Sequence, residues 1–414
     1  MRIGIIGGAG AMGSLYADQF VKQGYTVNVS DMSDNNAILE ERFGDDSHVR
    51  IMDGHDVSRN SDMIFYSVPA FEIGKIVEEY APSTSSDALI AGLTSVKAPE
   101  IKAFDQNLPN NPIVTGHSLH GPGIKTSGKN LVVMRYRSSD EQYNQAMEVY
   151  RSLESKIIEM PWEEHDKSTA DSQVITHLGF LSMGTAWKER GGFPWENGAY
   201  MGGIDNAKIL MMLRIYGGTP HVYSGLAILN PNARVQAKQY ADSTRELLGL
   251  MIDGNLESLR TRIMEAGEFV FRDSGELILD DNVLGDYSLG GLQHLAPNSN
   301  LAPLAMIDSW HKLGINPYAN KLKTPVFNAR LGIAEYLFRN LELLEKSFDD
   351  AVNLSGTTED DIQFNRAVHS WYYSIRMGAV KGYHQKFEET RKFFEGKLDE
   401  GKIRSTELIS KLGL

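Results

Sequence analysis

The N-terminal part of the chain alternates short apolar runs with amphipathic or polar stretches. Arg2–Gly8 is the first apolar run, and a helical pattern through Leu15, Phe20 and Val21 follows it. Later runs of the same character are Thr26–Asp31, Met63–Pro69, Ala88–Thr94, Pro112–Gly116, Leu131–Arg135 and Lys156–Met160. Strand-like runs that alternate with helical stretches are typical of a doubly wound, mostly parallel sheet. We therefore expect one α/β domain over residues 1–161.

The pattern changes after Pro161. Trp162–Glu189 contains no proline and few strand formers, which predicts one long helix. Helical spacing continues from about residue 205 to residue 268, and Asn230–Asn232 predicts a turn or a helix start within it. We expect a helical second domain over residues 162–280.

The last third of the chain begins with a different composition. Residues 272–325 are rich in Gly, Pro and Asn, as in Leu289–Gly291 and Ala296–Asn300, and predict a connector with short helices. Apolar residues then recur at helical spacing: Leu331, Ala334, Leu337, Phe338, Leu341, Leu344 and Phe348. A second helix follows a predicted cap at Thr357–Asp361, and its apolar positions are Phe364, Val368, Trp371 and Ile375. We expect a helical extension over residues 281–414, whose amphipathic helices fit a dimer interface and intrachain packing equally well.

The turn after the first apolar run is rich in glycine. Its sequence, Gly8-Ala9-Gly10-Ala11-Met12-Gly13, has the GxGxxG spacing between a strand and a helix. Glycine suits this place because a pyrophosphate must approach the backbone closely, and the turn directs helix N–H groups at the anion. We therefore predict a dinucleotide site of Rossmann type, with cofactor contacts from Gly8, Gly10, Ala11, Met12, Gly13, Asp31 and Ser67.

Asp31 ends the second strand-like run, about 20 residues after the glycine turn. A carboxylate at this place accepts hydrogen bonds from a ribose 2′-hydroxyl and repels a 2′-phosphate, so local chemistry favours NAD over NADP. Ser30 and Ser33 are able to donate to a phosphate, and Arg42 lies on the next predicted helix. These residues leave the choice of cofactor open.

Composition limits the partners. The chain has 414 residues, enough for two or three domains, and its net charge of −13 argues against nucleic acid or an anionic membrane surface. It has no cysteine, which excludes disulfides, thiol catalysis and thiolate metal sites. The histidines lack metal-ligand spacing, so no metal is expected. The absence of an apolar leader and of a membrane-spanning run predicts a cytoplasmic protein.

Two polar clusters follow strand-like runs on the side where an open α/β sheet binds its ligands. Thr94–Lys97 ends the fourth run, and Thr115–Gly123 ends the next. The second cluster contains His117 and His120, and one of these histidines could accept a proton near neutral pH.

The long predicted helix adds a third group. His177 and Gln173 interrupt an otherwise apolar stripe along it, which suits either a buried core histidine or a functional one. His165 and Asp166 lie near the helix start, where a cap and a partner of the helix dipole are expected. Arg214 follows in the helical domain.

Six motifs occur in the order and rough spacing of one known family. They are Gly8–Gly13, Thr94–Lys97, His117–Pro122, His165-Asp166, Ile175–Leu178 and Leu213-Arg214. With them the chain resembles the prephenate and arogenate dehydrogenases, most closely their fungal NADP-dependent branch. The C-terminal part is similar to that branch in Pro297–Leu301, Ile315–Tyr318 and Gly332–Phe338, so the resemblance covers nearly the whole chain.

The resemblance implies roles for single residues. His117 takes the place of the catalytic histidine, which begins an H-P-x-x-G motif in many members, and Ser118 stands here instead of the proline. Ser95 takes the place of the active-site serine, which bonds the substrate hydroxyl and the histidine. Substrate contacts are implied for His177, Arg214, Thr176 and His120, with Arg214 on a carboxylate and His120 as the alternative base.

The implied reaction is the oxidative decarboxylation of prephenate to 4-hydroxyphenylpyruvate in tyrosine biosynthesis. It needs NADP or NAD and no metal, and we expect a homodimer. Arogenate is the alternative substrate. A β-hydroxyacid or sugar-acid dehydrogenase is less consistent, because its usual catalytic lysine has no counterpart between Lys167 and Lys188. A non-enzymatic nucleotide sensor is the third hypothesis, and the polar residues at crevice positions argue against it.

Overall fold

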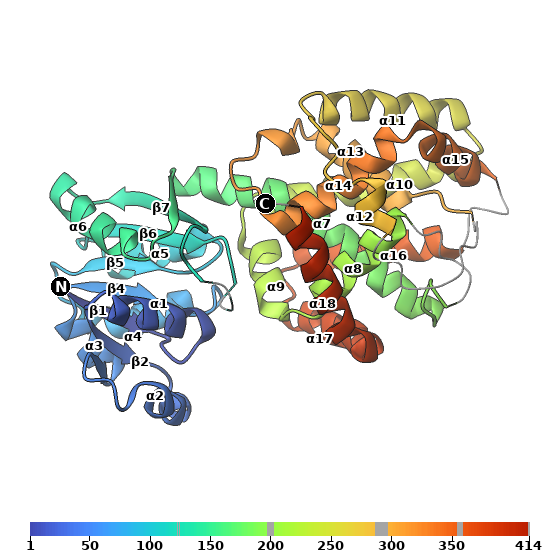
Figure 1. Cartoon of the computed structure of the whole chain (residues 1–414). Coiled ribbons are helices and arrows are strands. Elements are labelled where there is room, and N and C mark those ends of the chain that lie inside the picture. The colour runs from blue at the N-terminus through green and yellow to red at the C-terminus, as the bar shows by residue number, and fades with distance from the viewer. Residues whose placement is uncertain (122, 124, 197–202, 286–296, 354–358, 413–414) are drawn as a thin grey trace. The chain divides into compact units, whose positions relative to one another are not determined.

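The computed structural model describes residues 1–121, 123, 125–196, 203–285, 297–353 and 359–412. The chain forms two compact units, residues 1–167 and residues 168–414 (Figure 1). Leu289–Gly291 of the predicted connector and Thr357-Thr358 of the predicted cap lie outside the described residues. The further division of the helical part at residue 280 stays a prediction.

The described residues of the first unit contain one sheet with the strand order β3-β2-β1-β4-β5-β6-β7-β8. Its strands are β1 (Arg2–Ile6), β2 (Thr26–Ser30), β3 (Val49–Ile51), β4 (Met63–Tyr66), β5 (Leu89–Gly92), β6 (Ile113–Ser118), β7 (Asn130–Arg137) and β8 (Lys156–Glu159). β6 and β7 pair antiparallel, and the other neighbours pair parallel. The predicted mostly parallel α/β fold is confirmed. Only β3 was missed, because three residues are too few to show a pattern.

Helices cover both faces of this sheet (Figure 1). They are α1 (Ala11–Lys22), α2 (Asn36–Phe43), α3 (Gly54–Asn60), α4 (Ile73–Tyr80), α5 (Lys97–Asn107) and α6 (Asp140–Arg151). Neighbouring residues of β4 enter two different apolar cores: Phe65 packs with Tyr16 and Phe20, whereas Tyr66 packs with Phe104. Side chains alternate between the faces of a strand, so a sheet buried on both sides needs apolar residues in an unbroken run.

The second unit is helical throughout its described part. Its helices are α7 (Trp162–Arg190), which begins in the first unit, α8 (Ile204–Tyr216), α9 (Pro220–Leu229), α10 (Ala233–Ile252), α11 (Leu256–Phe271), α12 (Asp281–Gly285), α13 (Leu301–Lys312), α14 (Pro325–Arg339), α15 (Leu341–Val352), α16 (Glu359–Arg376), α17 (Val380–Phe393) and α18 (Glu395–Lys411). The long helix from Trp162 and the turn at Asn230–Asn232 are confirmed. Among the described helices, none is long and apolar enough to cross a membrane.

The apolar spacing from Leu331 to Phe348 belongs to two helices and not to one. The first, α14, ends at Arg339, and the Asn340 side chain then accepts a hydrogen bond from the Leu343 N–H at 3.1 Å. This is an N-cap, and it starts α15. Apolar spacing alone does not show the break, because a one-residue interruption hardly changes the periodicity.

The predicted connector also needs a correction. It contains α13, in which Leu304 and Trp310 are fully buried. This helix packs against α10 and α11 and is part of the core of the second unit. The glycine and proline content around it marks the turns at its ends.

Candidate active site

The glycine turn lies between β1 and α1, at the carboxyl edge of the sheet. Gly7 has a φ of +90°, and a Cβ at this residue would collide with the carbonyl oxygen of Ser67. A Cβ at Gly13 would collide with the carbonyl oxygen of Gly7. The turn is therefore restricted to glycine at both places. The sequence motif singled out Gly13 but not Gly7, although the double glycine before the motif was a usable signal.

Asp31 directly follows β2 and holds the glycine turn in place. Its Oδ2 accepts a hydrogen bond from the Ala9 N–H at 2.9 Å. Its Oδ1 accepts from the Met32 N–H at 2.8 Å and from the Asn35 side chain at 2.7 Å. Both carboxylate oxygens thus bond groups of the protein itself. The predicted contacts of Asp31, Gly8, Gly10, Ala11, Met12 and Ser67 with a cofactor stay predictions.

The strands place the predicted catalytic residues at the edge that carries the glycine turn. Ser95 lies between β5 and α5, and His117 is the last residue but one of β6. β1, β4, β5 and β6 are parallel, so the segments that follow their carboxyl ends share one edge of the sheet. This is the edge at which open α/β sheets bind ligands.

A fully buried ion pair connects the ends of β5 and β6. Lys97 Nζ lies 3.0 Å from Glu100 Oε1, and neither side chain is exposed. The same ammonium donates hydrogen bonds to the carbonyl oxygens of Gly92, at 3.1 Å, and Gly116, at 2.7 Å. Lys97 therefore fixes the backbone on either side of Ser95 and His117 and has no free chemistry of its own.

His117 is the first member of a chain of hydrogen bonds. Its Nδ1 lies 2.8 Å from His165 Nε2, and His165 Nδ1 lies 2.9 Å from Asp166 Oδ1. A carboxylate only accepts, so His165 donates from Nδ1 and accepts at Nε2. His117 then donates from Nδ1, which leaves a lone pair on its Nε2. Within the described residues, no protein group bonds that nitrogen.

Asp166 has a second task besides holding His165. Its two oxygens accept hydrogen bonds from the backbone N–H groups of Lys97 and Ala98, each at 2.8 Å. Asp166 therefore caps the start of α5. The sequence analysis expected a cap from the His165-Asp166 pair at the start of its own helix, and the structure shows that it serves another helix.

Both histidines of the chain are neutral near pH 7. Burial lowers the pKa of His117 well below its usual value, and the neighbouring His165, Lys97 and His120 lower it further. Burial also lowers the pKa of His165, and its hydrogen bond with Asp166 opposes that change. A neutral imidazole with a free nitrogen is able to accept a proton.

His120 and Ser118 have other partners. His120 Nδ1 lies 3.0 Å from the carbonyl oxygen of Gly121, and its Nε2 is buried without a hydrogen-bond partner among the described residues. The Ser118 hydroxyl lies 2.8 Å from the hydroxyl of Tyr16 in a buried pair. Of the two histidines, only His117 is oriented by a carboxylate through a hydrogen-bond chain.

The second unit brings together a different set of side chains. The rings of His177 and Tyr223 meet edge to face, with 5.0 Å between their centroids. Arg214 Nη1 donates to the hydroxyls of Ser405, at 3.3 Å, and Thr406, at 3.0 Å. The Thr176 hydroxyl donates to the carbonyl oxygen of Ser172 in its own helix, at 3.1 Å. The substrate contacts predicted for these residues stay predictions.

Arg330 belongs to the same set and was missed by the sequence analysis. It lies on α14, is 4% exposed, and has its guanidinium carbon 5.6 Å from the ring centre of Phe180. Its charge lowers the pKa of the buried His177, after burial itself. The available signal was a charged residue between Phe327 and Ala334 on an otherwise apolar stripe.

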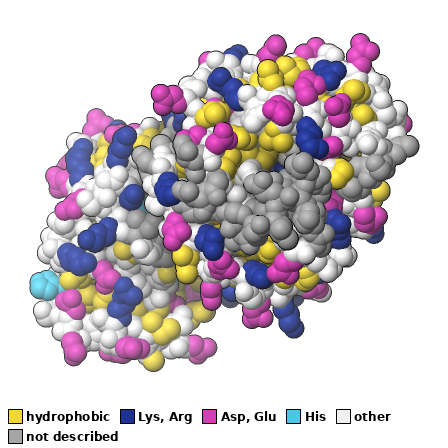
Figure 2. All heavy atoms as spheres, turned by 45° about the vertical axis from the view of Figure 1, so that its right-hand side comes forward, with side chains coloured by type: hydrophobic (Ala, Val, Ile, Leu, Met, Phe, Trp, Pro, Cys, Tyr) yellow, Lys and Arg dark blue, Asp and Glu magenta, His cyan; other side chains and the backbone are white. Residues whose placement is uncertain are grey.

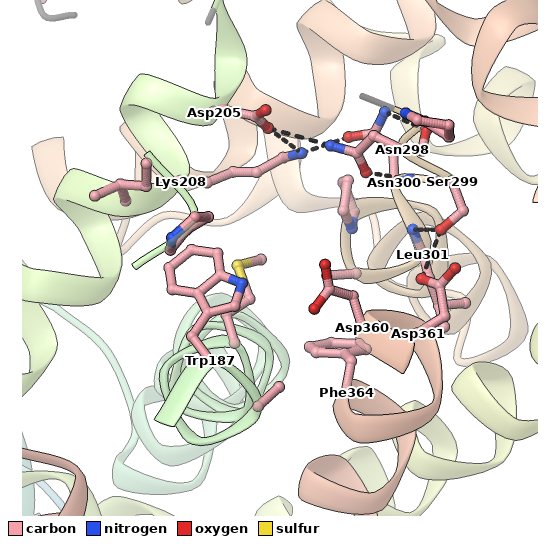
Figure 3. Close-up of a pocket in the computed structure, with 17 residues that line it drawn as sticks. Trp187, Asp205, Lys208, Asn298, Ser299, Asn300, Leu301, Asp360, Asp361 and Phe364 are labelled. Carbon is pink, nitrogen blue, oxygen red and sulfur yellow. Dashed lines mark hydrogen bonds and ion pairs between the residues drawn. The ribbon is translucent and has the colours of Figure 1, made fainter. Parts of the chain in front are cut away.

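A pocket of the second unit lies apart from the predicted site residues (Figure 3). Its lining includes Trp187, Lys208 and residues 297–303. Lys208 Nζ lies 2.8 Å from Asp205 Oδ1. The Ser299 hydroxyl donates to Asp361 at 2.7 Å, and burial raises the pKa of Asp361 to about 7. Its charged side chains are largely used in contacts with one another.

The surface charge is mixed. Acidic and basic side chains are interspersed with apolar ones on the face shown in Figure 2. A net charge of −13 repels an anionic substrate at long range, so an anion site on this protein needs a local group of cations. Within the described residues, no group of His, Asp and Glu side chains could hold a metal ion.

A glycine turn on a doubly wound sheet, a neutral histidine at the same edge and a helical second unit define the class of dinucleotide-dependent oxidoreductases. Two family models match the chain. The model for the nucleotide-binding domain of prephenate dehydrogenase matches residues 20–158, and that for a 6-phosphogluconate dehydrogenase C-terminal domain matches residues 174–413.

The curated relatives identify the family. The chain is 42% identical to the prephenate dehydrogenase [NADP(+)] of Saccharomyces cerevisiae, over 98% of this chain and 93% of the relative. It is 40% identical to a probable prephenate dehydrogenase [NADP(+)] of Schizosaccharomyces pombe, over 99% of this chain and 97% of the relative. A probable arogenate/prephenate dehydrogenase of Methanocaldococcus jannaschii is 22% identical over 65% of this chain and 60% of that protein. The chain belongs to the prephenate dehydrogenase family of oxidoreductases.

Proposed function

We propose that this protein oxidises prephenate with NADP⁺ and releases carbon dioxide, to give 4-hydroxyphenylpyruvate for tyrosine biosynthesis. The observation that carries the proposal is the hydrogen-bond chain from Asp166 through His165 to His117. It supplies a neutral, oriented base at the ligand edge of the sheet, which is what removal of a hydroxyl proton requires.

The glycine turn fits a dinucleotide. Gly7 and Gly13 leave no room for a side chain, so an anion meets only backbone at the start of α1. Gly8, Gly10, Ala11 and Met12 would line the pyrophosphate site. When bound, the nicotinamide accepts a hydride from the carbinol carbon of the substrate.

His117 accepts the proton of the substrate hydroxyl at Nε2, and Ser95 holds that hydroxyl by a hydrogen bond. The carbinol carbon becomes a carbonyl carbon as its hydride leaves. The ring carboxylate then departs as carbon dioxide, and its bonding electrons make the ring aromatic. Formation of the aromatic ring drives the reaction, so this chemistry asks for no metal ion and no covalent nucleophile.

Substrate binding is assigned to the second unit and to His120. Arg214 would bind a carboxylate through its guanidinium fork. His177 would donate a hydrogen bond as a neutral imidazole, because burial lowers its pKa well below the usual range. Thr176 would contribute through its place beside His177, since its hydroxyl already bonds the Ser172 carbonyl.

NADP⁺ is proposed over NAD⁺ for two reasons. Both relatives that align over nearly their whole length are named for NADP(+). The Asp31 carboxylate, which would favour NAD⁺ at a ribose hydroxyl, has both oxygens bonded to Ala9, Met32 and Asn35. It acts on the turn and need not meet the ribose.

The test is the absorbance of reduced nicotinamide after mixing the purified protein with prephenate or arogenate, each with NAD⁺ or NADP⁺. A rise with prephenate and NADP⁺ is expected. A rise only with arogenate would replace the substrate, and a rise only with NAD⁺ would give Asp31 its usual role. No rise with any pair would contradict the proposal.

A homodimer is proposed as the assembly. The support is a group of exposed apolar side chains on the neighbouring helices α10 and α16: Val235 is 63% exposed, Tyr373 54% and Met377 76%. Light scattering after size-exclusion chromatography should give twice the chain mass of 46.1 kDa. A monomer mass would contradict it. The cytoplasmic location stays a prediction.

A further inference from the structure

Arg330 is a buried cation without an anionic partner. Its side chain is 4% exposed, and its Nε has no hydrogen-bond partner in the described residues. No carboxylate in that part of the chain forms an ion pair with it. The nearest compensation is the face of the Phe180 ring, 5.6 Å from the guanidinium carbon.

This arrangement is costly for a protein to keep. Arginine is almost never buried unless it is paired, because a charge loses its hydration on burial. A cation–π contact returns only a small part of that loss. Burial accordingly lowers the pKa of Arg330 to about 10, and the second arginine, Arg214, acts in the same direction. A group kept at this cost is typical of a binding site.

The neighbours of Arg330 are hydrogen-bond donors or cations. Burial and the charge of Arg330 lower the pKa of His177 well below its usual range, so it is a neutral imidazole. Burial raises the pKa of Tyr223, so it is a phenol. Arg214 is the second cation, and its electrostatic influence reaches both Arg330 and Tyr223. Guanidinium, imidazole and phenol groups together form a donor set that fits a carboxylate.

We infer that Arg330 binds a carboxylate of the substrate and, together with Arg214, makes the protein prefer prephenate to arogenate. The inference rests on the proposed function. Prephenate carries two carboxylates and a keto group, which suits two arginines and two neutral donors. Arogenate carries an ammonium group in place of the keto group, and two guanidinium charges without a neighbouring carboxylate repel it.

The test compares three substitutions of Arg330 with one control. Arg330→Gln and Arg330→Met remove the charge at similar size, and Arg330→Lys keeps the charge but loses the planar fork. Arg339→Gln is the control, because Arg339 lies on the same helix, is exposed, and bonds Ser274. The measured quantities are kcat and KM for prephenate and for arogenate, with NADP⁺, and the thermal midpoint of the free protein.

Arg330→Gln and Arg330→Met should raise KM for prephenate by about 10- to 100-fold, the usual effect of losing a charge-assisted hydrogen bond. KM for arogenate should change less, so the preference for prephenate falls. Arg330→Lys should lie between these variants and the wild type. The thermal midpoint of Arg330→Met without substrate should not fall, because no partner is lost.

Each other outcome counts against the inference. An unchanged KM for prephenate in the Gln and Met variants would show that Arg330 does not bind substrate. A lower thermal midpoint, or a failure to fold, in Arg330→Met would show that the arginine stabilises the fold through a partner. If the wild type and Arg339→Gln both fail to reduce NADP⁺ with prephenate, the proposed function fails, and not this inference alone.

Discussion

At the scale of single residues, His117 differs from the other histidines in what orients it. The carboxylate of Asp166 fixes the tautomer of His165, and His165 fixes that of His117. The hydrogen-bond chain makes one nitrogen of one ring the base, a role that residue type and spacing left to either His117 or His120.

Substitution of His117 tests its role directly. His117→Ala should lower kcat by about 10²–10⁴-fold with little change in the affinity for prephenate, because a general base contributes to the proton transfer and not to binding. Steady-state kinetics with a binding titration measure both effects. His48→Gln, an exposed histidine of the same unit, is the control. Unchanged turnover in His117→Ala would move the base to His120.

The pH dependence of the reaction tests the positioning role of His165. Only neutral His117 accepts a proton, so kcat/KM falls as the pH falls through the pKa of His117. That pKa lies below the usual value of about 6.5, so the wild type should stay active below this pH. In His165→Asn one cause of the lowered pKa is removed, and the acid limb should move to higher pH. A lower rate with an unmoved acid limb would limit His165 to structural support.

At the scale of elements, the ends of β5 and β6 are held by a buried ion pair. Lys97→Met should destabilise the first unit by about 3–5 kcal/mol, since it leaves Glu100 charged and unpaired in the interior. Lys102→Met, on the exposed side of the same helix, is the control. Denaturant unfolding measures the loss. A double change of Lys97→Met with Glu100→Leu should recover part of the stability, and equal loss in both variants would show that the pair is not the cause.

The glycine turn sets the start of α1. Gly13→Ala places a Cβ against the carbonyl oxygen of Gly7, so the turn must open. NADP⁺ affinity should fall by at least about tenfold, the effect of about 1.4 kcal/mol. Gly74→Ala is the matched control, because a Cβ there meets no atom within 4 Å. Isothermal titration with NADP⁺ compares the two, and equal affinities would remove the turn from the cofactor site.

At the scale of the whole molecule, the chain has two compact units, and the cofactor is expected to bind the first of them. NADP⁺ at about 100 times its dissociation constant should stabilise residues 1–167 by about 2.7 kcal/mol. Hydrogen exchange followed by mass spectrometry should show the protection in β1, α1 and β2. Equal protection over α10 to α13 and over these elements would contradict binding at the glycine turn.

The sequence by itself determined the order and type of most elements. Apolar runs such as Ala88–Thr94 and the long helix from Trp162 depend on local pattern, and burial of an apolar face follows from that pattern whatever the neighbour. The glycine turn was predictable for the same reason, because its geometry is set within a few residues. The break at Asn340 and the strand β3 were not, since neither changes the pattern enough.

The tertiary structure decided which residues act together. Asp166 caps α5, 68 residues away from Ala98, and the same carboxylate orients His165 against His117. Arg330 is in contact with Phe180 of another helix, and its missing partner becomes visible only once its surroundings are known. Hydrogen bonds and unpaired charges depend on neighbours in space, whereas a local pattern records only neighbours along the chain.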